Sequence, residues 1–183
     1  MRKVAVLAVL LLAWVSSAVQ ADDPASMEKE LLNKTIQRIP PDRVIGTEQF
    51  KRIYDEVMAG NRKAYLIDVR THPEFYAGHI EGTDHVPAGN LRNLMEIIKD
   101  PDVQIILWCR TNPRTYYSAA FLYDCGYKNV WVWKDGIVGW IEKGYPLVNQ
   151  FMGRFTVTDY DKDLNEMDKE GKPLWRVRLF HPY

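Results

Sequence analysis

Short apolar runs alternate with amphipathic segments through the middle of this 183-residue chain. The clearest run, residues 103–109 (VQIILWC), is almost entirely apolar, as expected for a strand whose two faces are both covered. Further strand candidates lie at residues 64–70, 85–87 and 129–133, and segments with helical spacing of apolar side chains separate them. This alternation predicts an α/β fold with a mostly parallel sheet.

Residues that flank the amphipathic segments indicate where helices begin and end. Thr47 precedes a segment whose apolar side chains share one face, so we expect it to cap a helix that ends near Gly60. A second helix is expected around residues 90–99, and Asp100-Pro101 should terminate it because a residue before proline disfavours the helical conformation. A third helix follows residue 109 and closes at Gly126, and a last helix is expected within residues 136–147.

The length and charge of the chain limit its organisation and its partners. A chain of 183 residues suits one ordinary domain, which we place at residues 44–147. Residues 22–43 are expected to form a surface helix and linker, and residues 148–183 an extension packed on the domain. The 24 basic and 24 acidic residues give no net charge, which argues against a nucleic-acid partner.

The first 21 residues have the plan of a secretory signal peptide. A basic start at Arg2 and Lys3 precedes 12 apolar residues, and small residues follow up to Ala21. The apolar run is shorter than the roughly 20 residues that span a bilayer. We therefore expect cleavage near Ala21, a periplasmic or secreted protein, and no membrane span in the mature chain.

The chain has two cysteines, Cys109 and Cys125. An oxidising compartment would favour a disulfide between them. However, about ten intervening helical residues would separate them by roughly 15 Å, whereas a disulfide needs Cα atoms within about 7 Å. We therefore expect Cys109 to be a free cysteine at the end of a strand.

The heptapeptide CRTNPRT, which begins at Cys109, follows a strand and opens a helix. This is where α/β folds bind ligands, because N–H groups and the helix dipole attract anions. Arg110 and Arg114 would favour the reactive thiolate form of the cysteine. Asn112 suits a turn position with positive φ, and Pro113 suits the first turn of the helix.

Three segments resemble motifs of the rhodanese family, in the same order and over residues 44–147. CRTNPRT resembles the active-site loop, in which four residues separate Cys from Arg and Ser or Thr follows. Residues 126–147 resemble the closing strand and helix. The segment DVRTHPEFYAGHIEG resembles the family's strand end and turn through seven residues: Asp68, Arg70, Glu74, Phe75, Gly78, His79 and Ile80.

The resemblance implies a three-layer fold whose central, mostly parallel sheet of about five strands is flanked by helices. It implies a sulfurtransferase that carries sulfur as a persulfide on Cys109, without a metal or other cofactor. Asp68 and Arg70 would organise the site, and His79 would have a structural role. The substrate-binding loop implied by the resemblance comprises Arg110, Thr111, Asn112, Pro113, Arg114 and Thr115.

The family also implies the substrates, which are thiosulfate or another sulfane donor and a thiol or cyanide acceptor. Its four-residue spacing suits sulfur, whereas five residues in related phosphatases make a wider loop for phosphate. A phosphatase or arsenate reductase is therefore disfavoured. Three residues depart from the family pattern: Asn112 and Asp135 stand where glycines are usual, and Pro113 is uncommon beside Asn112.

The tail after Val148 is compatible with a second function. It could dock a protein partner, and the chain would then be a sulfur carrier or binding module rather than a fast enzyme. We expect a β-hairpin around Asp168–Pro173. The acidic stretch from Asp159 to Glu170 resembles part of a calcium loop, but Leu164 stands where such a loop needs Gly, so a solvated acidic loop is favoured.

Overall fold

The computed structural model describes residues 23–157. The expected signal peptide at residues 1–21, the hairpin expected around residues 168–173 and the acidic stretch 159–170 lie outside the described residues. Within residues 23–157, no helix has the length and apolar character needed to cross a membrane.

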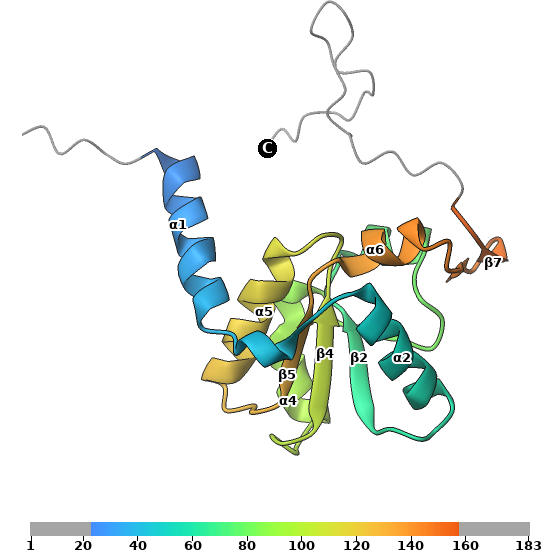
Figure 1. Ribbon diagram of the computed structural model, residues 1–183, viewed down its shortest axis with the longest axis horizontal. Helices are drawn as coiled ribbons and strands as arrows, with labels where there is room; N and C mark the ends of the chain where they lie inside the picture. Colours follow the sequence, from blue (N-terminus) through green and yellow to red (C-terminus); the bar gives the residue numbers. More distant parts are fainter. Residues whose placement is uncertain (1–22, 158–183) are drawn as a thin grey trace, which may run out of the picture.

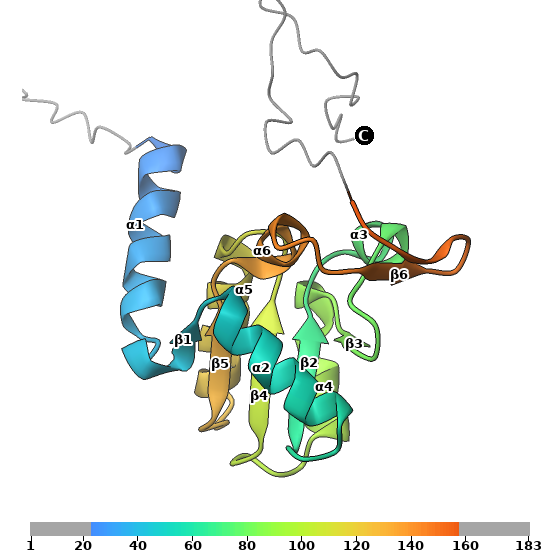
Figure 2. The ribbon, with the colours of Figure 1, turned by 45° about the vertical axis from the view of Figure 1, so that its right-hand side comes forward.

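Five parallel strands form the central sheet, whose middle strands β5, β4 and β2 are labelled in Figure 1. The full order is β1-β5-β4-β2-β3 (Figure 2). This confirms the expected fold class. The strands are β1 (Val44–Ile45), β2 (Ala64–Asp68), β3 (Asp84–His85), β4 (Gln104–Trp108) and β5 (Val130–Trp133).

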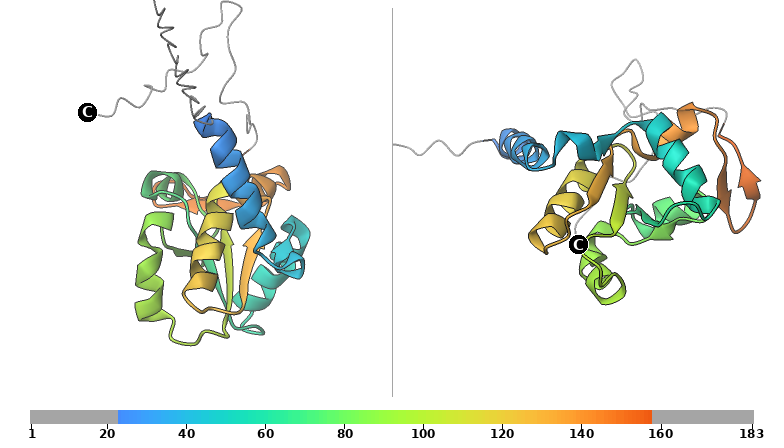
Figure 3. Two further views of the ribbon diagram at one scale, coloured as in Figure 1. Left: turned by 90° about the vertical axis from the view of Figure 1, so that its left-hand side faces the viewer. Right: turned by 60° about the horizontal axis from the view of Figure 1, so that its bottom comes forward.

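Helices cover both faces of the sheet and so complete three layers (Figure 3). One face packs against α1 (Pro24–Gln37), η2 (Ala88–Asn93), α4 (Leu94–Ile97) and α5 (Pro113–Asp124). The other face packs against α2 (Thr47–Met58) and α6 (Gly136–Glu142). The two short remaining helices are η1 (Pro41–Arg43), before β1, and α3 (His72–Ala77), after β2.

Strand β4 is apolar after Gln104 because its alternate side chains enter two different cores. Ile105 and Leu107 belong to the core beneath α5, whereas Ile106 and Trp108 belong to the core beneath α2 and α6. Phe50 of α2 stacks against an aromatic residue of β5, Trp133, with ring centroids 3.9 Å apart. The central strand is therefore fixed by packing on both sides.

Two helix boundaries differ from the sequence-based predictions. Thr47 is the first residue of α2 and Gly46 is the cap, because the Thr47 hydroxyl instead donates to Asp135 at 2.9 Å. The helix expected at residues 90–99 is divided into a 3-10 turn and the short α4. Glycines do close two helices as expected, with φ of 75° at Gly60 and 95° at Gly126.

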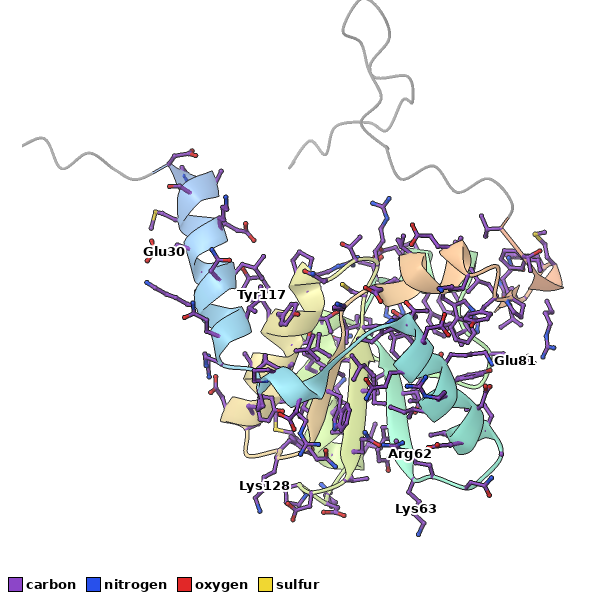
Figure 4. All side chains as sticks on the ribbon, viewed as in Figure 1. Glu30, Arg62, Lys63, Glu81, Tyr117 and Lys128 are labelled. Carbon is purple, nitrogen blue, oxygen red and sulfur yellow. The ribbon has the colours of Figure 1, made fainter. Side chains whose placement is uncertain are left out.

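Helix α1 is the surface helix expected at residues 22–43. The Tyr117 hydroxyl of α5 lies 3.2 Å from the Glu28 carboxylate of α1, and Figure 4 shows Tyr117 between the two helices. Leu32 and Ile36 of α1 pack against the core beneath α5. The helix is thus attached to the domain along one side.

A small antiparallel hairpin follows the last helix. It consists of β6 (Leu147–Asn149) and β7 (Gly153–Phe155), and it is separate from the hairpin expected around residues 168–173. Backbone hydrogen bonds in both directions, of 3.0 and 2.8 Å, join Val148 to His79. The hairpin therefore lies beside α3, above the carboxyl ends of the strands (Figure 2).

Truncating a core isoleucine tests this two-sided packing. Ile106 has no exposed surface, so Ile106→Ala should lower the free energy of unfolding by about 2 to 5 kcal/mol. The matched control, Ile97→Ala in α4, removes a side chain that is 65% exposed and should change it by about 0.5 kcal/mol or less. Urea unfolding measures both, and equal losses would contradict the described packing.

Candidate active site

The carboxyl ends of β2 and β4 bring the predicted site residues to one edge of the sheet. Asp68 at the end of β2 is in register with Trp108 at the end of β4, and Cys109 follows directly. Cys109 is buried, with 1% of its surface exposed, whereas Cys125 is exposed. Both cysteines are free, as expected.

Helix α6 holds the cysteine loop through backbone contacts. The N–H of Ile137 donates to the Cys109 carbonyl at 3.0 Å, and the N–H of Val138 donates to the Arg110 carbonyl at 3.3 Å. Gly136 permits this approach, because a Cβ there would lie 2.5 Å from the Cys109 carbonyl oxygen. Its φ of 58° also favours glycine.

The loop enters α5 differently from the sequence-based prediction. Asn112 has φ −159°, so the expected positive φ is wrong, and within residues 23–157 only glycines have positive φ. Its carbonyl accepts the N–H of Thr115 at 3.0 Å and starts the helix, while Pro113 occupies the first turn as expected. The left-handed residue at this site is Gly136, across the loop.

Polar groups of the loop face the start of α5. Within residues 23–157, the N–H groups of Thr111, Asn112 and Arg114 do not donate to a backbone carbonyl of a loop or cap, and the buried Thr115 hydroxyl has no hydrogen-bond partner. N–H groups at the start of a helix are well placed to bind an anion. The loop can therefore offer hydrogen bonds to an anionic sulfur compound.

Arg114 is held by a carboxylate that we had not included among the predicted site residues. Its guanidinium donates two hydrogen bonds to Glu74, of 2.6 and 2.7 Å. These bonds lower the pKa of Glu74 to about 2, with help from the N–H and hydroxyl of Thr71. The pKa of Arg114 is raised, first by Glu74 and further by the nearby Cys109. Arg114 thus places a positive charge beside the thiol.

The capping box of α3 is the sequence signal that could have identified Glu74. Thr71 and Glu74 have the spacing of such a box, and their side chains and backbone groups pair reciprocally in the structure. The box fixes the Glu74 side chain at the start of the helix. In that position the carboxylate can also pair with Arg114.

Asp68 and Arg70 form a buried ion pair behind this contact. The Arg70 Nη2 lies 2.7 Å from the Asp68 carboxylate, and the two side chains are 6% and 0% exposed. Arg70 also donates to the backbone carbonyls of Glu74 at 3.1 Å and Gly78 at 2.9 Å. The pair therefore connects β2 to both ends of α3, a geometry consistent with the predicted organising role.

His79 makes structural contacts. Its Nδ1 lies 3.1 Å from the Phe75 carbonyl, and its ring stacks on Phe75 with centroids 3.9 Å apart. These contacts fit the structural role expected for His79. Among residues 23–157, no group of three or more His, Cys, Asp or Glu side chains could hold a metal ion.

Two cavities open beside the loop, and Arg110 lines both. The first has a volume of about 610 Å³ and is also lined by Thr111 and by charged side chains. These are Glu48 of α2, Lys134 and Asp135 between β5 and α6, and Glu142 and Lys143 at the end of α6. The second, about 280 Å³, extends from Arg70, Glu74 and Arg110 toward the hairpin. Arg110 therefore borders one cavity with many charged side chains and a second one whose walls are mostly apolar.

Substituting Gly136 tests the contact between α6 and the loop. Gly136→Ala adds a methyl group against two carbonyls and should cost about 2 to 5 kcal/mol, through strain and overpacking. Gly144 also has positive φ, but a Cβ there meets nothing within 4 Å, so Gly144→Ala should cost only about 1 to 2 kcal/mol. Thermal unfolding compares them, and similar losses would contradict the tight contact.

Substituting Glu74 tests the ion pair through its pH dependence. In the folded chain the pKa of Glu74 is lowered from 4.5 to about 2, so its stabilising contribution is complete above pH 4.5 and is lost as the pH falls toward 2. At neutral pH, Glu74→Gln should lower the free energy of unfolding by about 1 kcal/mol, because the pair is partly exposed. Urea unfolding should show this gap shrinking near pH 3, and a gap independent of pH would contradict the pairing.

Comparisons with known proteins agree with this arrangement. Residues 49–143 match the Rhodanese-like domain family. A sulfurtransferase of Allochromatium vinosum is 33% identical over 92 residues, which make up 50% of this chain and 84% of that protein.

Two solved structures share the fold. The thiosulfate sulfurtransferase from Pseudomonas aeruginosa aligns with a TM-score of 0.56 and 20% identity, over 73% of this chain and 25% of that one. The polysulfide-sulfur transferase homodimer from Wolinella succinogenes aligns with a TM-score of 0.54 and 20% identity, over 70% of this chain and 91% of that one. Because the family match covers residues 49–143, more than half of the chain, and includes the cysteine loop and Glu74, the chain belongs to the rhodanese-like domain family.

Proposed function

We propose that this chain is a sulfurtransferase that moves sulfane sulfur through a persulfide on Cys109, with thiosulfate as a donor and a thiol or cyanide as acceptor. One observation carries the proposal. Four residues separate Cys109 from Arg114, and Glu74 holds the Arg114 guanidinium beside the thiol. A fixed positive charge next to a cysteine favours the nucleophilic thiolate.

The first half-reaction loads the enzyme. The Cys109 thiolate attacks the outer sulfur of thiosulfate and forms a new S–S bond. The S–S bond of thiosulfate breaks, and sulfite leaves with the bonding electron pair. N–H groups at the start of α5 would stabilise both the dianionic donor and the persulfide that remains.

The second half-reaction unloads it. A nucleophilic acceptor, either cyanide or a thiolate, attacks the outer sulfur of the persulfide. The bond between that sulfur and the Cys109 Sγ breaks, and Cys109 leaves as a thiolate that Arg114 stabilises. Cyanide then becomes thiocyanate, whereas a thiolate becomes a persulfide.

Relatives support this chemistry. The Allochromatium vinosum protein is named a sulfurtransferase, and its aligned region includes half of this chain. The four-residue spacing favours sulfur over the larger phosphate group, so a phosphatase is not proposed. The extension after Val148 keeps a sulfur-carrier role as the main alternative, and turnover distinguishes it from an enzyme.

Thiocyanate formation from thiosulfate and cyanide tests the proposal. The wild-type chain should form thiocyanate with repeated turnover, and Cys109→Ala should reduce the rate to that of the reaction without enzyme. Cys125→Ala, which removes the exposed cysteine at the far end of α5, should retain the wild-type rate. A wild-type rate no faster than that of Cys109→Ala would overturn the catalytic role for these substrates.

A further inference from the structure

The cavity of about 280 Å³ beside Arg110 has a polar end and apolar walls. Its polar end consists of Arg70, Glu74 and Arg110, the residue that follows Cys109 in the chain. The walls come from two other elements: Ile137 and Ile141 of α6, and Leu147, Phe155 and Val157 of the hairpin and the residues after it. The cavity therefore shares Arg70, Glu74 and Arg110 with the candidate active site.

The hairpin that forms one wall is built into the domain. Phe155 lies against Gly78, where a Cβ would come within 2.9 Å of its ring. The Asn149 side chain donates to the Ala77 carbonyl at 3.0 Å, in addition to the backbone pairing of Val148 with His79. Arg154 pairs with Glu81, which Figure 4 labels on the same side of the molecule as the hairpin. These contacts make Phe155 a fixed part of the cavity.

Three of the apolar residues that line the cavity lie outside the matched family region. That region ends at residue 143, whereas Leu147, Phe155 and Val157 follow it. Residues of this extension therefore alter the surroundings of a site that the domain supplies. Such residues are suited to selecting a substrate rather than to performing the common chemistry.

The charges at the polar end already have partners. Arg70 pairs with Asp68, and Glu74 pairs with Arg114, at 2.7 and 2.6 Å. A charged group of a ligand would gain little from either side chain. An apolar group would gain from leaving water, at roughly 0.8 kcal/mol for each buried methylene.

We infer that this cavity receives the apolar body of a small organic thiol, which is the sulfur acceptor. This inference rests on the proposed function and specifies its acceptor. The thiolate enters at the polar end and attacks the outer sulfur of the Cys109 persulfide. An S–S bond forms to the acceptor, the bond to the Cys109 Sγ breaks, and the acceptor leaves as an organic persulfide. Phe155 and Val157 determine specificity by burying the carbon chain.

A series of straight-chain thiols tests the inference. Sulfite release from thiosulfate is measured with ethanethiol, butanethiol or hexanethiol as acceptor. In the wild type, kcat/KM should rise about threefold to fourfold for each methylene until the cavity is filled. A series without dependence on chain length would overturn the inference.

Two substitutions assign this dependence to the cavity wall. In Phe155→Ala the rise should fall below about twofold per methylene, because the wall loses its largest apolar side chain. Phe151→Ala removes a ring of the same hairpin that is 84% exposed and does not line the cavity, so it should keep the wild-type dependence. The same dependence in both variants would overturn the role of Phe155. If Phe155→Ala fails to fold, Val157→Ser replaces it with the same expectation.

A binding measurement separates this inference from the proposed function. If no thiol accepts sulfur from the wild type, the proposed transfer to thiols fails. The cavity is then tested by calorimetry on Cys109→Ala, which should bind hexanethiol at least about tenfold more tightly than ethanethiol. Equal affinities for the two thiols would overturn the inference.

Discussion

The ion pair between Arg114 and Glu74 joins the loop after β4 to the helix after β2, and the surroundings of Cys109 depend on it. A buried pair, Asp68 with Arg70, fixes α3 from behind. The Arg114 charge therefore stays beside the thiol without a conformational change. A preorganised charge of this kind stabilises an anionic sulfur in a persulfide or in a departing thiolate.

Two further elements complete the site from the remaining sides. The N–H groups of α6 bind the carbonyls of Cys109 and Arg110, which only a glycine at position 136 allows at this distance. The β6–β7 hairpin supplies an apolar wall from beyond the matched family region. In the proposed function, the domain provides the nucleophile and the neighbouring charge, and the extension selects the acceptor.

Local sequence patterns were enough to predict four of the five strands, because each apolar strand and its following helix have distinct periodicities. Strand β1, only two residues long, was not among them. The patterns also identified Cys109 and the start of α5 at Pro113. Contacts between distant segments were not predictable in this way. Thr47 fails to cap α2 because its hydroxyl binds Asp135, 88 residues away in sequence. The hairpin register also depends on contacts with α3, far from it in sequence.

Mass spectrometry of the chain after incubation with thiosulfate tests the central claim most directly. The account predicts that the peptide containing Cys109 gains one sulfur atom, and that added cyanide or a thiol removes it. Cys125, exposed at the other end of α5, should gain none. An unmodified Cys109 peptide, or sulfur located on Cys125 instead, would contradict a persulfide mechanism at this site.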